Sequence, residues 1–323
     1  MKWSDKMKIV CIEPLGISED KVNELSKSLR ANGHQFVYYS TRVSESEALV
    51  ERGKDADVII IANLPLKGEV IEKCTKLKMI SVAFTGVDHI DINMCRAKNI
   101  MVCNAAGYST NAVTELAFGL IFSVLRNIIQ CDKAARNEKT KEGLVGNEIA
   151  GKTFGIVGTG AIGSMVADVA LAFGCNVIAY SRSIKAEIEK KGVKYVSLEE
   201  LMSKSDIVSL HLPCNDKTRG LISEEKLSLM KKSAVLINTA RGPIVDNSAL
   251  ARLLNEGLIA GAGVDVFETE PPISSSHPLV NAKNTVLTPH VAFASSEALV
   301  KRAIITFNNI TEWENGTPVN VIK

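Results

Sequence analysis

The sequence lacks the features that mark several classes of protein. Its 38 lysines and arginines nearly balance 36 aspartates and glutamates, so the net charge favours neither a nucleic acid nor an anionic membrane as a partner. No apolar run approaches the about 20 residues that span a bilayer, and the N-terminal residues have no apolar signal core. The seven cysteines are dispersed and form no Cys-x-x-Cys pair, which argues against a disulfide framework and a zinc site. We therefore expect a cytoplasmic protein with reduced thiols, no bound metal, and no nucleic-acid or membrane partner.

Short apolar runs alternate with helical stretches, a pattern that predicts parallel sheets with helices on both faces. One series of expected strands covers residues 8–12, 36–39, 58–61, 79–83 and 101–103, and a second covers 153–157, 177–180, 207–210, 234–238, 260–264 and 285–288. A long helical pattern at 109–136 separates the two series, and another at 295–313 follows the second. At 323 residues the chain can form two domains with separate cores. We expect an α/β protein with two doubly wound parallel-sheet domains, one of residues 106–290 inserted into another made of 1–105 and 291–323.

A glycine motif follows the expected strand 153–157 and opens a helix. It reads Gly158-Thr159-Gly160-Ala161-Ile162-Gly163. Such a motif alone occurs by chance in ordinary turns, but a strand before it and a helix after it are the context of a dinucleotide site. The glycines permit a tight turn, close approach of the backbone to a pyrophosphate, and close packing of helix on strand. We therefore expect 106–290 to be a Rossmann nucleotide-binding domain.

The end of the next strand, 177–180, bears on the choice of cofactor. An acidic residue about 20 positions past the glycines accepts the ribose hydroxyls of NAD, but here the residues are Ser181, Arg182 and Ser183. Arg182 can pair with a 2′-phosphate, and both serines can donate hydrogen bonds to it. We expect NADP(H) to be favoured, with NAD(H) possible. The alternative is that Arg182 stacks on adenine or faces water, which leaves both cofactors acceptable.

Charged residues follow three expected strands of the second series. Arg241 follows 234–238, Asp265 and Glu270 follow 260–264, and His290 follows 285–288. Taken singly, an arginine after a strand is usually a solvated charge and a histidine after Thr-Pro a loop residue. Together at the carboxyl edge of one sheet, where α/β proteins bind ligands, a cation, a carboxylate and an imidazole suit the reduction of a 2-keto acid.

In these motifs the chain resembles the D-isomer-specific 2-hydroxyacid dehydrogenases. The resemblance covers nearly the whole chain and rests on the glycine motif, His211-Leu212-Pro213, Asn238-Thr239-Ala240-Arg241-Gly242, Asp265–Pro272 and Pro289-His290, in this order. It implies that the inserted Rossmann domain accompanies a split, flavodoxin-like substrate domain.

The family's catalytic roles map onto three residues. By resemblance, Arg241 holds the substrate carboxylate and polarises the keto oxygen, and His290 is the general acid and base. Glu270 corresponds to the carboxylate that bonds the other imidazole nitrogen and favours the protonated ring. Asp265 corresponds to a carboxylate that tunes the electrostatics or organises the loop.

The resemblance also implies contacts to the cofactor and the substrate. Besides the glycine motif and Ser181–Ser183, the cofactor contacts are His211, Leu212, Pro213, Thr218, Thr239, Ala240, Asp265 and His290. The substrate contacts are Thr85, Gly86 and Val87, whose backbone N–H groups bind the carboxylate, together with Arg241 and His290. The loop 62–66 faces the same site in the family and holds no arginine here, which counts against a phosphorylated substrate. Leu64 and Phe293 are expected to form an apolar wall or to pack in the core, and His34 and His277 to lie in turns or at the surface.

The predicted reaction is a reversible, NAD(P)H-dependent reduction of a small unphosphorylated 2-keto acid to the D-2-hydroxy acid. Glyoxylate, hydroxypyruvate, pyruvate or a similar acid fits, and the sequence does not choose among them. Alternatives on the same scaffold are a formate or phosphite dehydrogenase, although formate dehydrogenases typically have glutamine where this chain has Glu270. A non-catalytic dinucleotide sensor is a further alternative.

The apolar stripe of the helical stretch 109–136 is larger than one domain needs to bury. Relatives associate through the equivalent region, so the resemblance implies a homodimer.

Overall fold

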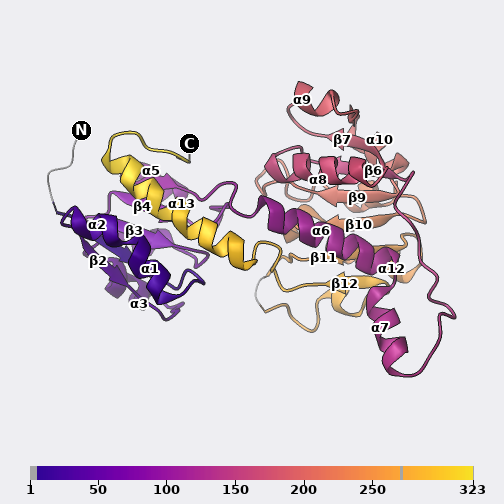
Figure 1. Cartoon of the computed structure of the whole chain (residues 1–323), viewed down its shortest axis with the longest axis horizontal. Helices are drawn as coiled ribbons and strands as arrows, with labels where there is room; N and C mark the ends of the chain where they lie inside the picture. Colours follow the sequence, from indigo (N-terminus) through magenta and orange to yellow (C-terminus); the bar gives the residue numbers. More distant parts are fainter. Residues whose placement is uncertain (1–5, 270–271, 323) are drawn as a thin grey trace. The chain divides into compact units, whose positions relative to one another are not determined.

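The computed structural model describes residues 6–269 and 272–322, and the chain divides into two compact units (Figure 1). One unit comprises Met1–Ser109 with Ala294–Lys323, and the other comprises Thr110–Phe293. These boundaries lie a few residues C-terminal to the expected ones. Each unit is a parallel sheet covered by helices on both faces.

The described part of the first unit has a five-stranded parallel sheet in the order β2-β1-β3-β4-β5. This is the flavodoxin-like order. Every side chain of β3 and β4 is buried, as expected for apolar strands in the middle of a covered sheet. The strands are β1 (Lys8–Cys11), β2 (Gln35–Tyr38), β3 (Val58–Ile61), β4 (Met79–Val82) and β5 (Met101–Cys103).

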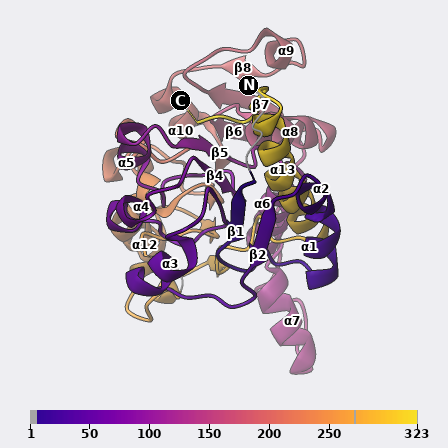
Figure 2. The same ribbon diagram turned by 90° about the vertical axis from the view of Figure 1, so that its left-hand side faces the viewer.

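Helices α1 and α13 lie on one side of this sheet and α3, α4 and α5 on the other (Figure 2). Helix α13 comes from the end of the chain and is fixed by polar contacts to the first hundred residues. Ser81 Oγ donates to Thr306 O (2.9 Å), and Asn309 Nδ2 donates to Asn104 O (2.9 Å). The helices are α1 (Glu19–Leu25), α2 (Lys27–Ala31), α3 (Ser46–Gly53), α4 (Gly68–Lys73), α5 (Ile92–Ala97) and α13 (Ser296–Glu314).

The second unit has, among its described residues, a seven-stranded parallel sheet in the order β12-β11-β10-β9-β6-β7-β8. Counted from β6, this is the Rossmann order extended by one strand. The two doubly wound parallel sheets predicted from the sequence are thereby confirmed. The strands are β6 (Thr153–Val157), β7 (Asn176–Tyr180), β8 (Lys194–Tyr195), β9 (Ile207–Leu210), β10 (Val235–Asn238), β11 (Gly261–Val264) and β12 (Thr285–Leu287).

Helices α6 and α8 cover one face of this sheet, and α10, α11 and α12 cover the other. Two glycines of β11 allow α6 to lie directly on the strand, because a Cβ at Gly263 would be 2.8 Å from Leu120 Cβ and one at Gly261 would be 2.6 Å from the Val124 side chain. The helices are α6 (Thr110–Leu125), α7 (Ile128–Arg136), α8 (Ala161–Ala172), α9 (Ala186–Glu189), α10 (Leu198–Lys204), α11 (Glu224–Leu227) and α12 (Asn247–Asn255), with 3₁₀ turns η1 (Gly242–Ile244) and η2 (Pro278–Asn281).

The prediction of a single helix at 109–136 is wrong, because the segment forms two helices whose axes meet at 59°. Asn127 between them has a φ of 53°, the left-handed conformation that ends a helix. The carbonyl of Leu125 accepts the N–H of Asn147 instead of continuing the helical pattern. Among the described residues, no single helix is long and apolar enough to cross a membrane. The bent pair α6–α7 has the required length and composition only when its two helices are taken together.

Candidate active site

The glycine-rich turn lies between β6 and α8, beside the exit of β9. A Cβ at Gly163 would be 1.9 Å from Gly158 O, and a Cβ at Gly158 would be 2.5 Å from His211 O. Packing within the protein therefore requires both of these glycines. A Cβ at Gly160 meets nothing within 4 Å, so this position borders open space at the start of α8, where Ala161 and Ile162 begin the helix. An open approach to a helix N-terminus is what a pyrophosphate needs.

A tyrosine that the sequence analysis did not single out supports this turn. Tyr195 Oη donates to Thr159 Oγ1 (2.9 Å), and Lys185 N donates to Tyr195 Oη (3.3 Å). Tyr195 lies on β8, an edge strand that periodicity did not predict. Its hydroxyl joins the glycine turn to the segment that follows β7.

That segment holds the three residues expected to select the cofactor. Ser181 is half-buried, and Arg182 and Ser183 are exposed. In the part of the chain that the structure describes, Arg182 makes no ion pair with a carboxylate. Its charge is therefore not offset by a neighbouring acid.

The exit of β9 carries His211, Leu212 and Pro213. His211 Nε2 lies 2.9 Å from Ser209 Oγ, and burial lowers the pKa of His211 to about 3, so its ring is neutral at physiological pH. The hydroxyl of Thr218 donates to Pro213 O (2.6 Å) and accepts from Asn215 N (2.9 Å). Thr218 thus closes the loop 213–218 through its side chain.

Asn238 organises the exit of β10. Its Oδ1 accepts from Ala240 N (3.0 Å) and its Nδ2 donates to Arg241 O (3.0 Å). Between these bonds lies Thr239, which is buried and whose Oγ1 has no hydrogen-bond partner among the described residues. A buried hydroxyl without a partner, together with the open glycine turn, fits a bound dinucleotide. Thr239 and the turn 158–163 would hold it.

Arg241 lies between this turn and η1. Gly242 follows it, and a Cβ there would be 2.0 Å from Phe267 C. Only glycine permits so close an approach of two backbones. The Arg241 turn is therefore packed against the chain that leaves β11.

Asp265 begins that chain and holds the turn that carries His290. Its carboxylate is fully buried and accepts from Thr288 Oγ1 (2.5 Å), Val291 N (2.9 Å) and Ala292 N (2.9 Å). His290 N donates to Asp265 O (2.8 Å). Burial raises the pKa of Asp265, and these hydrogen bonds act in the opposite direction. Both carboxylate oxygens are used within the turn, so the predicted cofactor contact of this residue stays a prediction.

His290 adopts a left-handed conformation with a φ of 55°. A residue with a Cβ rarely adopts this conformation, and it persists where the surroundings impose it. Here the imposing groups are the Asp265 carboxylate and carbonyl. The Phe293 ring meets the His290 ring edge to face, with centroids 5.6 Å apart.

Glu270 lies outside the described residues, so its predicted role is not addressed by the structure. Glu268 and His277, on either side of it in sequence, form a pair with Nε2 2.8 Å from Oε2. Asn247 Nδ2 donates to the other oxygen of Glu268 (2.8 Å). His277 lies in a turn, as expected, since its N–H donates to Ser274 O (3.0 Å), and 10% of its side chain is exposed. No local feature of the sequence predicts the pairing of Glu268 with His277.

In the first unit, Thr85, Gly86 and Val87 follow β4. No backbone acceptor in the described part of the chain receives their N–H groups. Thr85 O accepts from Asn104 Nδ2 (2.7 Å), which fixes the loop on the neighbouring strand exit. Successive N–H groups without acceptors form a binding site for a carboxylate.

Leu64 and Phe293 differ in exposure. Leu64 is buried, and Phe293 is half-buried beside His290. The loop 62–66 itself holds no arginine, but Arg42 reaches it and donates to Asn63 Oδ1 (3.0 Å). Arg42 is far from this loop in sequence, so the residues of the loop alone do not reveal the cation beside it.

Among the described residues, no group of three or more histidine, cysteine, aspartate or glutamate side chains is placed to hold a metal ion. The Rossmann sheet, the open glycine turn and the unpartnered Thr239 hydroxyl instead define a dinucleotide-binding protein.

Comparisons with known proteins identify the family. The family model described as "D-isomer specific 2-hydroxyacid dehydrogenase, NAD binding domain" matches residues 118–292. A hydroxypyruvate reductase of Blautia hydrogenotrophica is 33% identical over 306 residues, which are 92% of this chain and 94% of the relative. A glyoxylate reductase of Aeropyrum pernix is 39% identical over 288 residues, which are 86% of each chain. A solved structure, the acyclic imino acid reductase Bsp5 in complex with NADPH and D-Arg, is 35% identical with a TM-score of 0.88, covering 98% of this chain and 100% of that chain.

The chain belongs to the D-isomer specific 2-hydroxyacid dehydrogenase family. It is an oxidoreductase with a nicotinamide-dinucleotide-binding domain. The resemblance inferred from the motifs is confirmed.

The Asp265 turn yields a prediction. In Asp265→Asn the amide NH₂ would face the N–H of Val291 or Ala292, and the turn that fixes His290 would open. We expect kcat/KM for a 2-keto acid to fall about 100-fold, the cost of misplacing a reacting group by about 1 Å. Steady-state kinetics measures this fall, and quenching of protein fluorescence by NADPH shows separately whether the predicted cofactor contact of Asp265 is lost as well.

Asp206→Asn is the matched control. Asp206 accepts Thr153 N (2.9 Å) at the amino edge of the same sheet, away from the strand exits. Equal losses of turnover in both variants would contradict a specific role for Asp265.

Proposed function

We propose that this protein reduces a small, unphosphorylated 2-keto acid to the D-2-hydroxy acid, reversibly and with a reduced nicotinamide cofactor. The observation that carries the proposal is the placement of the chemistry-bearing residues on neighbouring strands. Arg241 follows β10, Asp265 follows β11, and the His290 turn follows β12, which are adjacent in the sheet. The relatives named glyoxylate reductase and hydroxypyruvate reductase support this substrate class.

Arg241, His290 and the loop at 85–87 have different roles in the proposed reaction. Arg241 binds the substrate carboxylate and polarises the keto oxygen, because a guanidinium is permanently charged and can bond two oxygens. In the first unit, the N–H groups of Thr85, Gly86 and Val87 are the proposed contacts to a carboxylate. When bound, the reduced nicotinamide supplies the hydride that adds to the keto carbon. The protonated His290 ring donates its proton to the oxygen as the C=O electron pair localises there, and in oxidation it takes the proton back.

Glu270 completes the proposed machinery as the hydrogen-bond partner of the His290 ring. The left-handed turn fixes the His290 backbone, and a carboxylate bonded to one ring nitrogen would set the rotation of the ring. A carboxylate in that position also stabilises the imidazolium.

Arg241→Ala tests the function. We expect kcat/KM for hydroxypyruvate and glyoxylate to fall about 10²–10³-fold, as for removal of one charge-stabilising donor, while NADPH still binds. Loss of nicotinamide absorbance measures turnover. Arg252→Ala is the control, because Arg252 pairs with the exposed carboxylates of Glu224 on α11 and Glu256 directly after α12. Unchanged turnover in Arg241→Ala would refute the assignment, and an unmodified protein that binds NADPH without turnover of any keto acid would be a sensor.

We propose that NADPH is preferred and that NADH is also accepted. The exposed guanidinium of Arg182 and the hydroxyls of Ser181 and Ser183 support this, since no acidic residue there would repel a 2′-phosphate. The cofactor contacts expected at 158–163, His211, Leu212, Pro213, Thr218, Thr239 and Ala240 remain part of this proposal.

A carboxylate at position 181 should reverse the preference. In Ser181→Asp the repulsion of a 2′-phosphate, about 1–2 kcal/mol at close range, lowers the ratio of kcat/KM for NADPH to that for NADH about tenfold. Ser203→Asp adds the same charge at an exposed position of α10 and is the control. A ratio that stays constant in Ser181→Asp would remove Arg182 and its neighbours from cofactor selection.

We also propose a cytoplasmic homodimer. Its support is an apolar patch on α6, α7 and the end of α8, made of Phe122, Ile128, Ile129 and Phe173, in which Ile128 is 48% and Phe173 46% exposed. An apolar patch of this kind on a folded protein usually marks an interface. Light scattering coupled to size exclusion should give twice the chain mass at micromolar concentration, and a monomer would contradict the dimer.

The cytoplasmic location is supported by buried thiols. Burial raises the pKa of Cys74, Cys95 and Cys103 to about 11, which suits thiols that stay reduced. Cell fractionation tests this location.

A further inference from the structure

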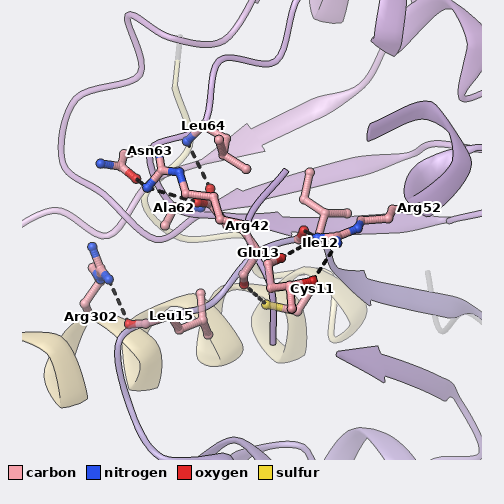
Figure 3. A network of polar contacts seen from close by, with 11 residues as sticks. Cys11, Ile12, Glu13, Leu15, Arg42, Arg52, Ala62, Asn63, Leu64 and Arg302 are labelled. Carbon is pink, nitrogen blue, oxygen red and sulfur yellow. Dashed lines mark hydrogen bonds and ion pairs between the residues drawn. The ribbon is translucent and has the colours of Figure 1, made fainter. Parts of the chain in front are cut away.

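A buried carboxylate occupies the switch point of the first sheet. The chain leaves neighbouring strands β1 and β3 in opposite directions, and in open α/β sheets this is where ligands bind. Here Glu13, which follows β1 after Ile12 and is 1% exposed, lies at that point. Its Oε1 accepts from both Ala62 N (2.7 Å) and Leu64 N (3.0 Å), the two ends of the turn that follows β3 (Figure 3).

An arginine closes the outer side of this arrangement. Arg42 Nη1 lies 3.8 Å from Glu13 Oε2 and donates to Asn63 Oδ1 (3.0 Å) (Figure 3). Arg52 in turn donates to Ile12 O (2.7 Å) and Thr41 O (2.5 Å), and so ties the segment that bears Arg42 to the end of β1. All three residues of the turn, 62, 63 and 64, are therefore fixed by side chains from outside it.

The residues that follow the fixed turn are bonded to the chain that carries the proposed carboxylate-binding loop. Leu66 N donates to His89 O (2.9 Å), and Asp91 N donates to Leu66 O (3.2 Å), so the chains that leave β3 and β4 are bonded together. Thr85, Gly86 and Val87 belong to the second of these chains. A substrate carboxylate bound there has the turn 62–64 as its neighbour within this unit.

The orientation of Asn63 follows from the same contacts. Because Arg42 occupies Oδ1, the amide N–H groups point away from Arg42, and Nδ2 has no partner among the described residues. Asn63 is half-buried. It thus offers a hydrogen-bond donor suited to a hydroxyl or carbonyl oxygen.

We propose that Glu13 is a positioning residue: through Ala62, Leu64 and Arg42 it sets Asn63, and thereby the selectivity for the substituent on C3 of the 2-keto acid. The proposal rests on the proposed function. Hydroxypyruvate has a hydroxyl on C3, whereas glyoxylate has no C3, so a donor at Asn63 distinguishes the two substrates.

Two variants separate the contacts of Glu13. In Glu13→Gln the amide oxygen can still accept both backbone N–H groups, but its NH₂ faces Arg42 and displaces it from Asn63. Loss of one oriented hydrogen bond, about 1 kcal/mol, should raise KM for hydroxypyruvate about fivefold relative to KM for glyoxylate. KM for NADPH should stay the same. Arg42→Met should give a similar change, and the double variant no further one.

Glu13→Ala removes the backbone contacts as well. Hydrogen exchange followed by mass spectrometry should then show faster exchange confined to residues 61–66. This readout does not depend on turnover. If the unmodified protein reduces no keto acid but Glu13→Ala still releases 61–66, the proposed function fails while the structural part of the inference holds.

The pH dependence of stability shows whether a changed KM ratio in Glu13→Gln results merely from a less stable fold. Burial raises the pKa of Glu13 above its unfolded value, and the facing groups are Arg42, Arg302 of α13 and the thiol of Cys11. A raised carboxyl pKa means that the wild type loses stability as pH rises through it. Glu13→Gln should therefore be at least as stable as the wild type at pH 8, with its relative stability decreasing towards pH 4.5. A changed KM ratio in a variant of undiminished stability supports positioning.

Asp57→Asn is the matched control. Asp57 accepts Lys8 N (2.9 Å) and pairs with Lys78 (2.8 Å) at the amino edge of the same two strands. It should leave the KM ratio unchanged. An unchanged ratio in Glu13→Gln and Arg42→Met, or a ratio that shifts equally in Asp57→Asn, would overturn the proposal.

Discussion

Backbone N–H groups at the carboxyl edge of a parallel sheet have left the ladder and need acceptors, and this requirement shapes both units. A buried group without a partner costs free energy comparable to a lost hydrogen bond. In the first unit Glu13 supplies the acceptor to Ala62 and Leu64, and in the second Asp265 supplies it to Val291 and Ala292. Where the protein provides no acceptor, at Thr85–Val87, the N–H groups are available to an anion. The same edge is thus rigid at some loops and open at others.

Local patterns account for what the sequence predicted well. The strands β3, β5, β6 and β9 begin and end at the expected residues, because buried parallel strands are short apolar runs between polar turns. The glycine motif was informative for a related reason. Gly163 is required by a contact with Gly158 O and Gly158 by a contact with His211 O at a neighbouring strand end, so the spacing of these two glycines encodes the geometry of the turn.

The features that the sequence did not reveal depend on distant partners or on a single conformation. Glu13 bonds residues 49 and 51 positions away, and no periodicity marks an acid at the end of a strand as buried. The same holds for His34, which was expected at a turn or the surface but is buried against Glu314 and accepts Met7 N (3.1 Å). The apolar spacing from 109 to 136 continues through Asn127, whose left-handed backbone alone divides the helix. Strand β8 has two residues, too few for any alternation to appear.

The position of α13 determines the order in which the chain can be completed during synthesis. This helix covers one face of the first sheet, and Arg302 within it donates to Leu15 O (2.8 Å) across 287 residues of sequence. Until residues 296–314 have left the ribosome, the side of the sheet that carries Ser81 has α1 but lacks α13. The inserted unit, 110–293, is fully synthesised earlier. The part of the protein that is translated first is therefore the part that is finished last, and a chain cut short before α13 would contain the nucleotide-binding unit attached to a sheet that is only partly covered on one side.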